Sequence, residues 1–300
     1  ASKSVLFTIF SSQIPLAGKL YKTVVHKLMK PTDYPEKLYK YRSWSNEYHQ
    51  KILTENQLYL ASPNDFNDPI DCRIGNNYSL LDTDEKIEDY AEIITQRHWN
   101  SLIKMGLDPN HEKKRIIREL KTNMNSMQNG DDENTFKMQD KHFGILSLSA
   151  RFDSILMWSH YADFHKGFCI GFSEEKLRES NLFGKGGPVA YNDEFPKIDP
   201  RDNRTPEKSF LQTHTKAKDW KYEEEYRLTK LFFPDEPKPS DRIVTVPTEF
   251  MTEIILGLKI SDEHKAKIVD IGKEKGLKIY QIEQVPFEFK LIKKPVYNTV

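Results

Sequence analysis

The feature that most constrains the fold is a change of pattern in the middle of the chain. Segments such as LYKYR, at residues 38–42, alternate apolar and polar positions, as half-buried β-strands do. Between about residues 80 and 141 the apolar residues recur every three or four positions, which is typical of amphipathic helices. Strand-like segments resume at residues 143–149. We therefore predict an α+β protein with a mixed or antiparallel central sheet and a helical insertion at about residues 80–141.

The domain organisation follows from a breaker near the N-terminus. The sequence PTDYP, which ends at Pro35, separates an N-terminal extension, residues 1–36, from the rest of the chain. The extension contains the apolar stretch SVLFTIFSSQIPLAG, which Pro15 interrupts. We interpret this stretch as an element that docks on the body rather than as a secretion signal. Residues 37–300 contain no internal repeat, and we predict that they form a single α+β domain.

Composition and charge exclude several classes of protein. The chain has 45 Lys and Arg residues and 45 Asp and Glu residues, so its formal net charge is zero, which disfavours a nucleic-acid-binding protein. The two cysteines, Cys72 and Cys169, cannot form a disulfide framework and lack the spacing of a zinc site, which favours a reducing compartment. No apolar run is long enough to cross a membrane. We therefore predict a cytoplasmic protein with no membrane partner.

The remaining elements follow from periodicity and turn chemistry. Predicted helices cover residues 46–57, 153–163 and 261–275, and predicted strands cover residues 58–62, 168–172, 222–232, 242–246, 253–257, 278–282 and 287–292. Asp153 or Ser154 is the predicted cap of the second of these helices. Residues 129–132, residues 184–188 and residues 193–218 are predicted as a loop, a glycine-rich turn and a loop-rich segment.

The segment WKYEEEYR carries the sharpest chemical pattern. On a strand, alternate side chains share a face, so Glu223 and Glu225 would lie about 7 Å apart with Lys221 and Arg227 on the same side. Two such carboxylates suit paired roles, one stabilising developing positive charge and the other orienting a nucleophile. The alternative is a solvated ladder of salt bridges that contributes little stability.

The segment LASPNDFNDPID predicts a rigid polar loop directly after a strand. Pro69 favours an extended conformation at Asp68, and Asn64 and Asn67 can form turns with their side chains. Such loops at strand ends often hold ligands. A structural loop that satisfies its own hydrogen bonds is the alternative.

The segment MWSHYADFHKG raises the question of a metal site. His160, Asp163 and His165 are of the right residue types, but two ligands on a helix should stand four residues apart. A five-residue step rotates His165 by about 140° away from His160. We therefore predict packed or hydrogen-bonded histidines and no metal site.

These segments, in this order, resemble the bacterial family known as domain of unknown function 2971. The resemblance rests on LYKYRS, ILTENQLYLASPNDFNDPIDC, LSLSARFDSILMWSHYADFHKGFCIGF, KDWKYEEEYRL and EIILGLKIS, and it spans about residues 37–260. FNDP and MWSHYADFHKG are its most specific parts. The resemblance leaves the N-terminal extension unexplained and supplies no activity.

The order of parts is also similar to that of ADP-ribosyltransferases of the bacterial toxin type. That pattern has a basic residue on an early strand, Ser-x-Ser on a middle strand and Glu-x-Glu on a late strand. The matching positions here are Lys40 or Arg42, Ser147 and Ser149, and Glu223 and Glu225. At position 40 the chain has lysine where that pattern has arginine, and Arg42 lies on the same face of the predicted strand. The resemblance implies a split central sheet, NAD as the substrate and no metal.

The same resemblance implies roles for individual residues. Glu225 would stabilise the ribosyl oxocarbenium ion as nicotinamide leaves, Glu223 would orient or deprotonate the acceptor, and Arg42 would complete the catalytic set. The residues expected to bind NAD are Lys40, Tyr41, Tyr59, Ser62, Phe66, Asn67, Asp68, Ser147, Ser149, Trp158, His160, Tyr161 and Arg227. The acceptor, a protein or a nucleic acid, stays open. A toxin or an anti-phage defence effector, with a partner protein or antitoxin, fits such an activity.

Two other functions remain open from the sequence. The first is a metal-dependent nuclease or phosphodiesterase, in which acidic side chains hold Mg²⁺ against phosphate. Its candidate ligands are Asp68, Asp71, His160, Asp163, Glu223 and Glu225. The second is a non-catalytic module that senses a nucleotide or a phage-derived ligand.

Overall fold

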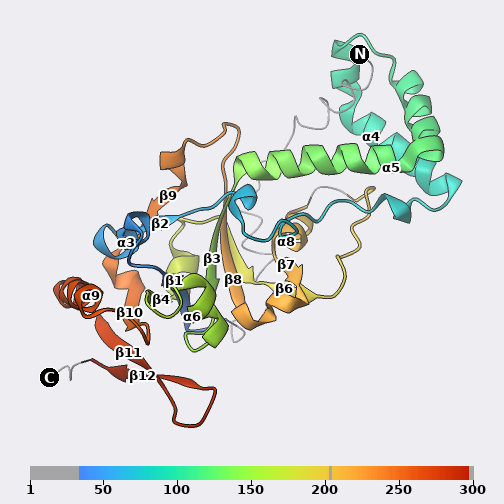
Figure 1. Ribbon diagram of the computed structural model, residues 1–300. Helices are drawn as coiled ribbons and strands as arrows, with labels where there is room; N and C mark the ends of the chain where they lie inside the picture. Colours follow the sequence, from blue (N-terminus) through green and yellow to red (C-terminus); the bar gives the residue numbers. More distant parts are fainter. Residues whose placement is uncertain (1–33, 203–204, 297–300) are drawn as a thin grey trace.

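A central β-sheet with helices packed on it forms the body of the protein, and two long helices extend to one side (Figure 1). The computed structural model describes residues 34–202 and 205–296, so the apolar stretch of the N-terminal extension lies outside the described residues. The strands are β1 (Lys37–Arg42), β2 (Gln57–Tyr59), β3 (Phe143–Ser149), β4 (Phe168–Ser173), β5 (Lys185–Pro188), β6 (Ala190–Asn192), β7 (Thr215–Ala217), β8 (Glu225–Leu231), β9 (Ile243–Thr245), β10 (Met251–Leu256), β11 (Lys278–Gln284) and β12 (Leu291–Pro295). The α-helices are α3 (Glu47–Thr54), α4 (Asp84–Lys104), α5 (Pro109–His142), α6 (Ile155–Tyr161), α7 (Glu174–Glu179), α8 (Pro206–Thr213) and α9 (Asp262–Glu274).

Eight strands form the central sheet in the order β12-β11-β10-β4-β1-β3-β8-β5. β10 and β11 run parallel, and the other neighbouring strands of this sheet run antiparallel. Two small sheets, β2 with β9 and β6 with β7, stand beside it. The predicted α+β class with a mixed sheet is confirmed.

The sheet opens along one line, between β1 and β3. These two strands are neighbours, but their register consists of Tyr39 opposite Ser149 alone. In contrast, β1 pairs along its whole length with β4, and β3 pairs along its whole length with β8. Lys40 spans the opening, because its Nζ donates a hydrogen bond to the carbonyl oxygen of Ser147 at 2.5 Å. We call this line the seam.

Alternation along the strands divides the core between the two faces of the sheet. On one face Leu38 and Phe172 pack in a cluster with side chains from α3, α7 and α9. On the other face Tyr39, Tyr41 and Trp158 pack in a second cluster, to which α6 contributes. Because successive side chains on a strand point to opposite faces, β1 serves both clusters.

The start of β4 lies against β1, and Gly167 permits this approach. A Cβ atom at Gly167 would lie 2.1 Å from the carbonyl oxygen of Arg42, which is a distance that two backbones cannot accommodate. The helix before it, α6, begins with Ser154 as its N-cap, whose side chain accepts a hydrogen bond from the backbone N–H of Met157. The absence of a side chain at Gly167 therefore lets the start of β4 approach the end of β1 at Arg42.

Helices α4 and α5 occupy the residues of the predicted helical insertion and pack against each other away from the sheet (Figure 1). They share a separate apolar cluster that includes Tyr90, Ile94 and Ile116. The predicted loop at residues 129–132 is wrong, because α5 continues through these residues to His142 and leads directly into β3. The helix bends at Asn123, whose φ and ψ are not helical.

Two further local predictions are wrong. Residues 184–188, predicted as a glycine-rich turn, contain β5, which pairs with β8. A Cβ atom at Gly186 would lie 2.4 Å from the side chain of Leu228. Glycine is therefore required at this position for close packing and not for a turn. Residues 193–218, predicted as loop-rich, contain α8 and β7. Among the described residues, no helix has the length and apolar character needed to cross a membrane.

Candidate functional site

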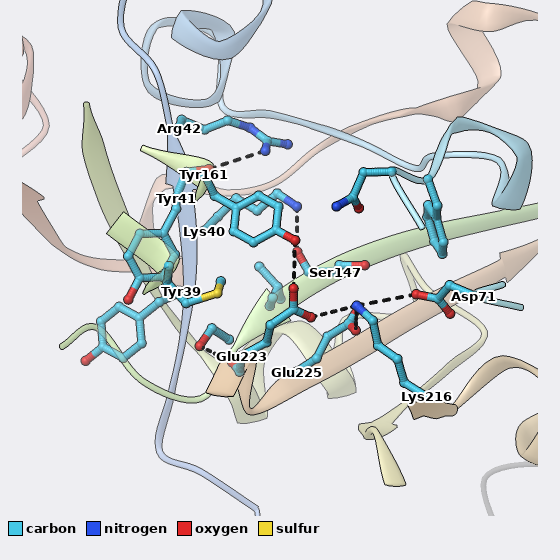
Figure 2. A pocket seen from close by; sticks show the side chains of 15 residues that line it. Tyr39, Lys40, Tyr41, Arg42, Asp71, Ser147, Tyr161, Lys216, Glu223 and Glu225 are labelled. Carbon is cyan, nitrogen blue, oxygen red and sulfur yellow. Dashed lines mark hydrogen bonds and ion pairs between the residues drawn. The ribbon is translucent and has the colours of Figure 1, made fainter. Parts of the chain in front are cut away.

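A pocket opens at the seam between β1 and β3 (Figure 2). The space within it, with open solvent at its mouth included, is about 530 Å³. The residues that line it are Tyr39, Lys40, Tyr41, Arg42, Phe66, Asn67, Asp71, Ser147, Leu148, Ser149, Met157, Tyr161, Lys216, Glu223 and Glu225. They come from stretches far apart in the sequence, so only the tertiary fold brings them together.

One wall of the pocket is basic. Lys40 and Arg42 point from the same face of β1, and Figure 2 shows Arg42 at the far end of the pocket from Lys216. Burial and the adjacent Arg42 guanidinium hold the pKa of Lys40 well below its usual range. Burial also lowers the pKa of Arg42 to about 10, and its Nη1 donates to the carbonyl oxygen of Tyr41 at 3.3 Å. Both shifts arise because cations are held away from water, and an anionic ligand would relieve that cost.

The opposite side of the pocket carries the two glutamates. The prediction that Glu223 and Glu225 share a face of one strand is wrong, because β8 begins at Glu225 and Glu223 ends a 3₁₀ helix, η4 (Lys218–Glu223). Glu224 between them adopts a left-handed conformation with φ of 42° and turns its side chain outward to Arg151. This turn still directs both flanking carboxylates into the pocket. Each of the two residues is at most 5% exposed, which excludes a solvated salt-bridge ladder.

A single lysine joins these carboxylates. Lys216, on β7, places its Nζ 2.7 Å from Glu223 Oε2, 3.2 Å from Glu225 Oε2 and 3.4 Å from Asp71 Oδ2. Arg227 lies beneath them, fully buried, with its Nε 2.7 Å from Glu225 Oε1 and its Nη2 2.5 Å from Asp71 Oδ2. We call these five residues the carboxylate floor.

The two glutamates have opposite pKa shifts. Burial would raise the pKa of Glu225, but the adjacent Arg227 and Lys216 outweigh it and hold that pKa well below the usual range. Burial raises the pKa of Glu223, and the attraction of Lys216 only partly offsets this. Neighbouring cations therefore favour the ionised form of Glu225, whereas Glu223 is a carboxylate that can exchange a proton more readily.

Hydroxyl groups fix the position of Glu223. Tyr161, on α6, donates from its hydroxyl to Glu223 Oε1 at 2.7 Å, and Ser149 Oγ donates to the carbonyl oxygen of Glu223 at 2.6 Å. Both residues were predicted for the site. Ser147 lies beside Glu225 in the lining, and its carbonyl oxygen accepts the hydrogen bond from Lys40.

The structure places three of the loop and strand residues predicted to bind NAD outside the pocket lining. Tyr59 lies on β2 and is 45% exposed. Ser62 caps a short helix and donates to the carbonyl oxygen of Asp140, while Asp68 accepts from the backbone N–H of Ile70. These two residues build the rigid loop that carries Phe66 and Asn67 into the pocket.

Three further predicted residues lie behind or beside the lining. Trp158 is fully buried, and its Nε1 donates to the carbonyl oxygen of Phe152, so it belongs to the core. His160 contacts the hydroxyl of Tyr222 on the outside. Arg227 supports the carboxylate floor from below and contacts no open space.

Sequence reasoning missed Lys216 and did not assign Asp71 to the NAD site. Asp71 belongs to the motif FNDPID, so its place at the end of the predicted ligand loop was a usable signal. Lys216 stands in a polar segment predicted as loop-rich, where one lysine among many has no distinguishing pattern. Its contacts with three carboxylates exist only because β7 lies beside η4 and β8.

The six candidate ligands of the nuclease interpretation do not form one metal site. Across residues 34–202 and 205–296 no group of three His, Cys, Asp or Glu side chains is placed to hold a metal ion. His160 contacts Tyr222, Asp163 accepts from Ser43, and Asp68 belongs to its own turn. Where three carboxylates do approach each other, the ammonium of Lys216 stands between them.

Comparison with known families adds one finding. Residues 157–228 match the DUF2971 family, which is described as a protein of unknown function. The match supports the resemblance of MWSHYADFHKG and WKYEEEYRL to this family, and it covers most of α6, all of β4 and the carboxylates of η4 and β8. No curated protein and no solved structure matches the chain. The match therefore supports a relationship between this chain and the family, but it supplies no activity.

Proposed function

We propose that the chain is an NAD-dependent ADP-ribosyltransferase whose reaction takes place in the pocket at the seam. The observation that carries this proposal is the pair of buried glutamates with opposite pKa shifts, facing the half-buried cations of Lys40 and Arg42 across one cavity. A fixed anion and a proton-accepting carboxylate are the groups that glycosyl transfer through a cationic intermediate needs.

The reaction breaks the bond between C1 of the nicotinamide ribose and the ring nitrogen. The bonding electrons leave with nicotinamide, which becomes neutral, and positive charge develops on the ribose. Glu225 stabilises this charge because its own carboxylate remains ionised. The acceptor nucleophile then bonds to C1, and Glu223 takes the proton that the nucleophile loses.

The basic wall accounts for the other half of the substrate. NAD carries a diphosphate, and Lys40 and Arg42 offer donors on the side of the pocket away from Lys216. A phosphate there restores charge balance to cations that burial disfavours. Phe66, in the lining, offers an aromatic face for the nicotinamide or adenine ring.

The test is nicotinamide release from NAD by the purified full chain, measured by chromatography with and without a cell lysate as a source of acceptor. Labelled NAD reports transfer to the acceptor. Glu225→Gln should lower nicotinamide release by about 100-fold or more, since removal of a single stabilising group commonly costs that much. Glu224→Gln is the matched control, because Glu224 is next to Glu225 in the chain but its side chain points outward to Arg151.

Equal turnover by the two glutamine variants would refute the role of Glu225. Circular dichroism checks that Glu225→Gln is folded, and calorimetry checks that it still binds NAD. Binding of NAD by the unaltered chain without any turnover would instead support a nucleotide-sensing module. The macromolecular acceptor and a role in toxicity or anti-phage defence stay predictions.

A further inference from the structure

Lys216 occupies an unusual position for a lysine. Its side chain is 5% exposed, and its ammonium lies within 3.4 Å of Asp71, Glu223 and Glu225. It also lies 4.7 Å from the centre of the Trp220 ring, which covers it. Because the contacts come from a loop, from η4 and from β8, Lys216 joins three separate parts of the carboxylate floor.

We propose that Lys216 is a positioning residue that holds Glu223 and Glu225 at a fixed spacing and prevents them from sharing a proton. This inference rests on the proposed function, because it assigns different tasks to the two glutamates. It goes further in naming the residue that keeps those tasks separate.

The charges of the carboxylate floor support this role. Three carboxylates, of Asp71, Glu223 and Glu225, are compensated by two cations, Lys216 and Arg227, which leaves one negative charge. That single charge faces the pocket, where a ribosyl cation would form. Without Lys216 two negative charges would remain in a buried space, and closely placed carboxylates then retain a proton between them.

The hydrogen bonds show which glutamate Lys216 controls most. Arg227 already contacts both carboxylate oxygens of Glu225, at 2.7 and 2.9 Å. Glu223 has Tyr161 on one oxygen and Lys216 on the other, so Lys216 is its cationic partner. Loss of Lys216 therefore affects Glu223 more than Glu225.

Other titratable and charged groups also act on Glu223, and they set the reference for any pH experiment. They are Glu225 on β8, Lys40 on β1, Tyr161 on α6 and Tyr191 on β6, with Tyr222 on η4 beside it. All of them remain when Lys216 is replaced. A difference between the unaltered chain and a variant at this position then reports the loss of one ammonium.

The first experiment measures nicotinamide release against pH for Lys216→Met, Lys216→Arg and the control Lys218→Met. Lys218 stands two residues away, is largely exposed and pairs with Asp193 on the surface. Lys216→Met should lower kcat by about 100-fold with little change in KM, since misplacement of a catalytic group costs about that much. In the plot of rate against pH for Lys216→Met, the rise on the acid side should move to higher pH, because Glu223 loses the cation that favours its ionised form.

Lys216→Arg retains the charge and should restore the pH profile of the unaltered chain. Lys218→Met should leave rate and profile unchanged. The inference would be overturned if the acid side of the pH–rate profile did not move in Lys216→Met. It would also be overturned if that side moved as far in Lys216→Arg as in Lys216→Met.

The second experiment needs no turnover. Carbon-13 NMR of protein labelled at glutamate carboxyl carbons follows the titration of Glu223, which Glu223→Gln assigns. In Lys216→Met the Glu223 signal should titrate at higher pH than in the unaltered chain. An unmoved signal would refute the inference even for an inactive protein, whereas absence of turnover with a moved signal would count only against the proposed function.

A variant with balanced charge covers the case in which Lys216→Met does not fold. Lys216→Met combined with Asp71→Asn removes one cation and one carboxylate, so the net charge of the carboxylate floor stays as it is. The double variant should fold and should still show the raised titration of Glu223. Titration at the pH of the unaltered chain would refute the positioning role.

Discussion

Replacement of Arg227 by methionine should destabilise the protein strongly. The guanidinium is fully buried and bonds to Asp71 and Glu225 through four contacts between 2.5 and 2.9 Å. It also donates to the carbonyl oxygen of Thr213 at 2.7 Å. Methionine fills much of the space but leaves two buried carboxylates without this partner.

Removal of one member of a buried ion pair typically costs about 3–5 kcal/mol. We expect a loss of that size in the free energy of unfolding for Arg227→Met, measured by urea denaturation at pH 7. Arg151→Met is the control. Arg151 pairs with Asp153 and Glu224 at the surface, where such contacts contribute about 0–1 kcal/mol.

The difference in the free energy of unfolding between the unaltered chain and Arg227→Met should change with pH in one direction. Arg227 and Lys216 hold the pKa of Glu225 below its usual value, so ionised Glu225 contributes stability above that usual value, and the contribution is lost as pH falls through the lowered pKa. In Arg227→Met the same carboxylate is buried with less compensation. The gap in stability between the two proteins should therefore narrow below about pH 5. A loss under about 1 kcal/mol, or a gap that stays constant with pH, would refute this reasoning.

Two further predictions concern packing and thiol reactivity. Gly167→Ala should lower the stability by about 1–3 kcal/mol in thermal unfolding, because the new Cβ would meet the carbonyl oxygen of Arg42 at 2.1 Å; an unchanged melting temperature would contradict it. Burial raises the pKa of the Cys72 thiol to about 12, and burial likewise raises that of Cys169 well above its usual value. Both should resist a thiol reagent at pH 8 until urea unfolds the chain, and rapid reaction of the native protein would show that one of them is accessible.

Local patterns determined much of the fold. The alternation in residues 38–42 predicted β1, and the three- and four-residue spacing between residues 80 and 141 predicted the helices α4 and α5. These predictions succeeded because the spacing of apolar residues has the period of a strand or of a helix, and β1 has this spacing although both of its faces are packed. Ser154 was among the predicted caps for the same reason, since capping depends on the residues next to it.

Local errors arose where tertiary contacts override composition. Asn129, Gly130 and the two aspartates after them favour a loop, yet α5 continues through them. The glycines of residues 184–188 favour a turn, yet β8 provides a partner strand and Leu228 fills the space beside Gly186. In both cases the neighbours that decide the conformation lie far away in the sequence.

The candidate site shows the same division. The sequence by itself determined which segments carry the chemistry, because WKYEEEYR and the FNDP loop hold unusual sets of polar residues. Only the tertiary structure decided that Glu223 leaves the strand, that Arg227 and Lys216 lower the pKa of Glu225, and that Lys216 stands between the two glutamates. The physical reason is that charge and burial depend on what surrounds a side chain in space. The seam between β1 and β3 brings those surroundings together from distant parts of the chain.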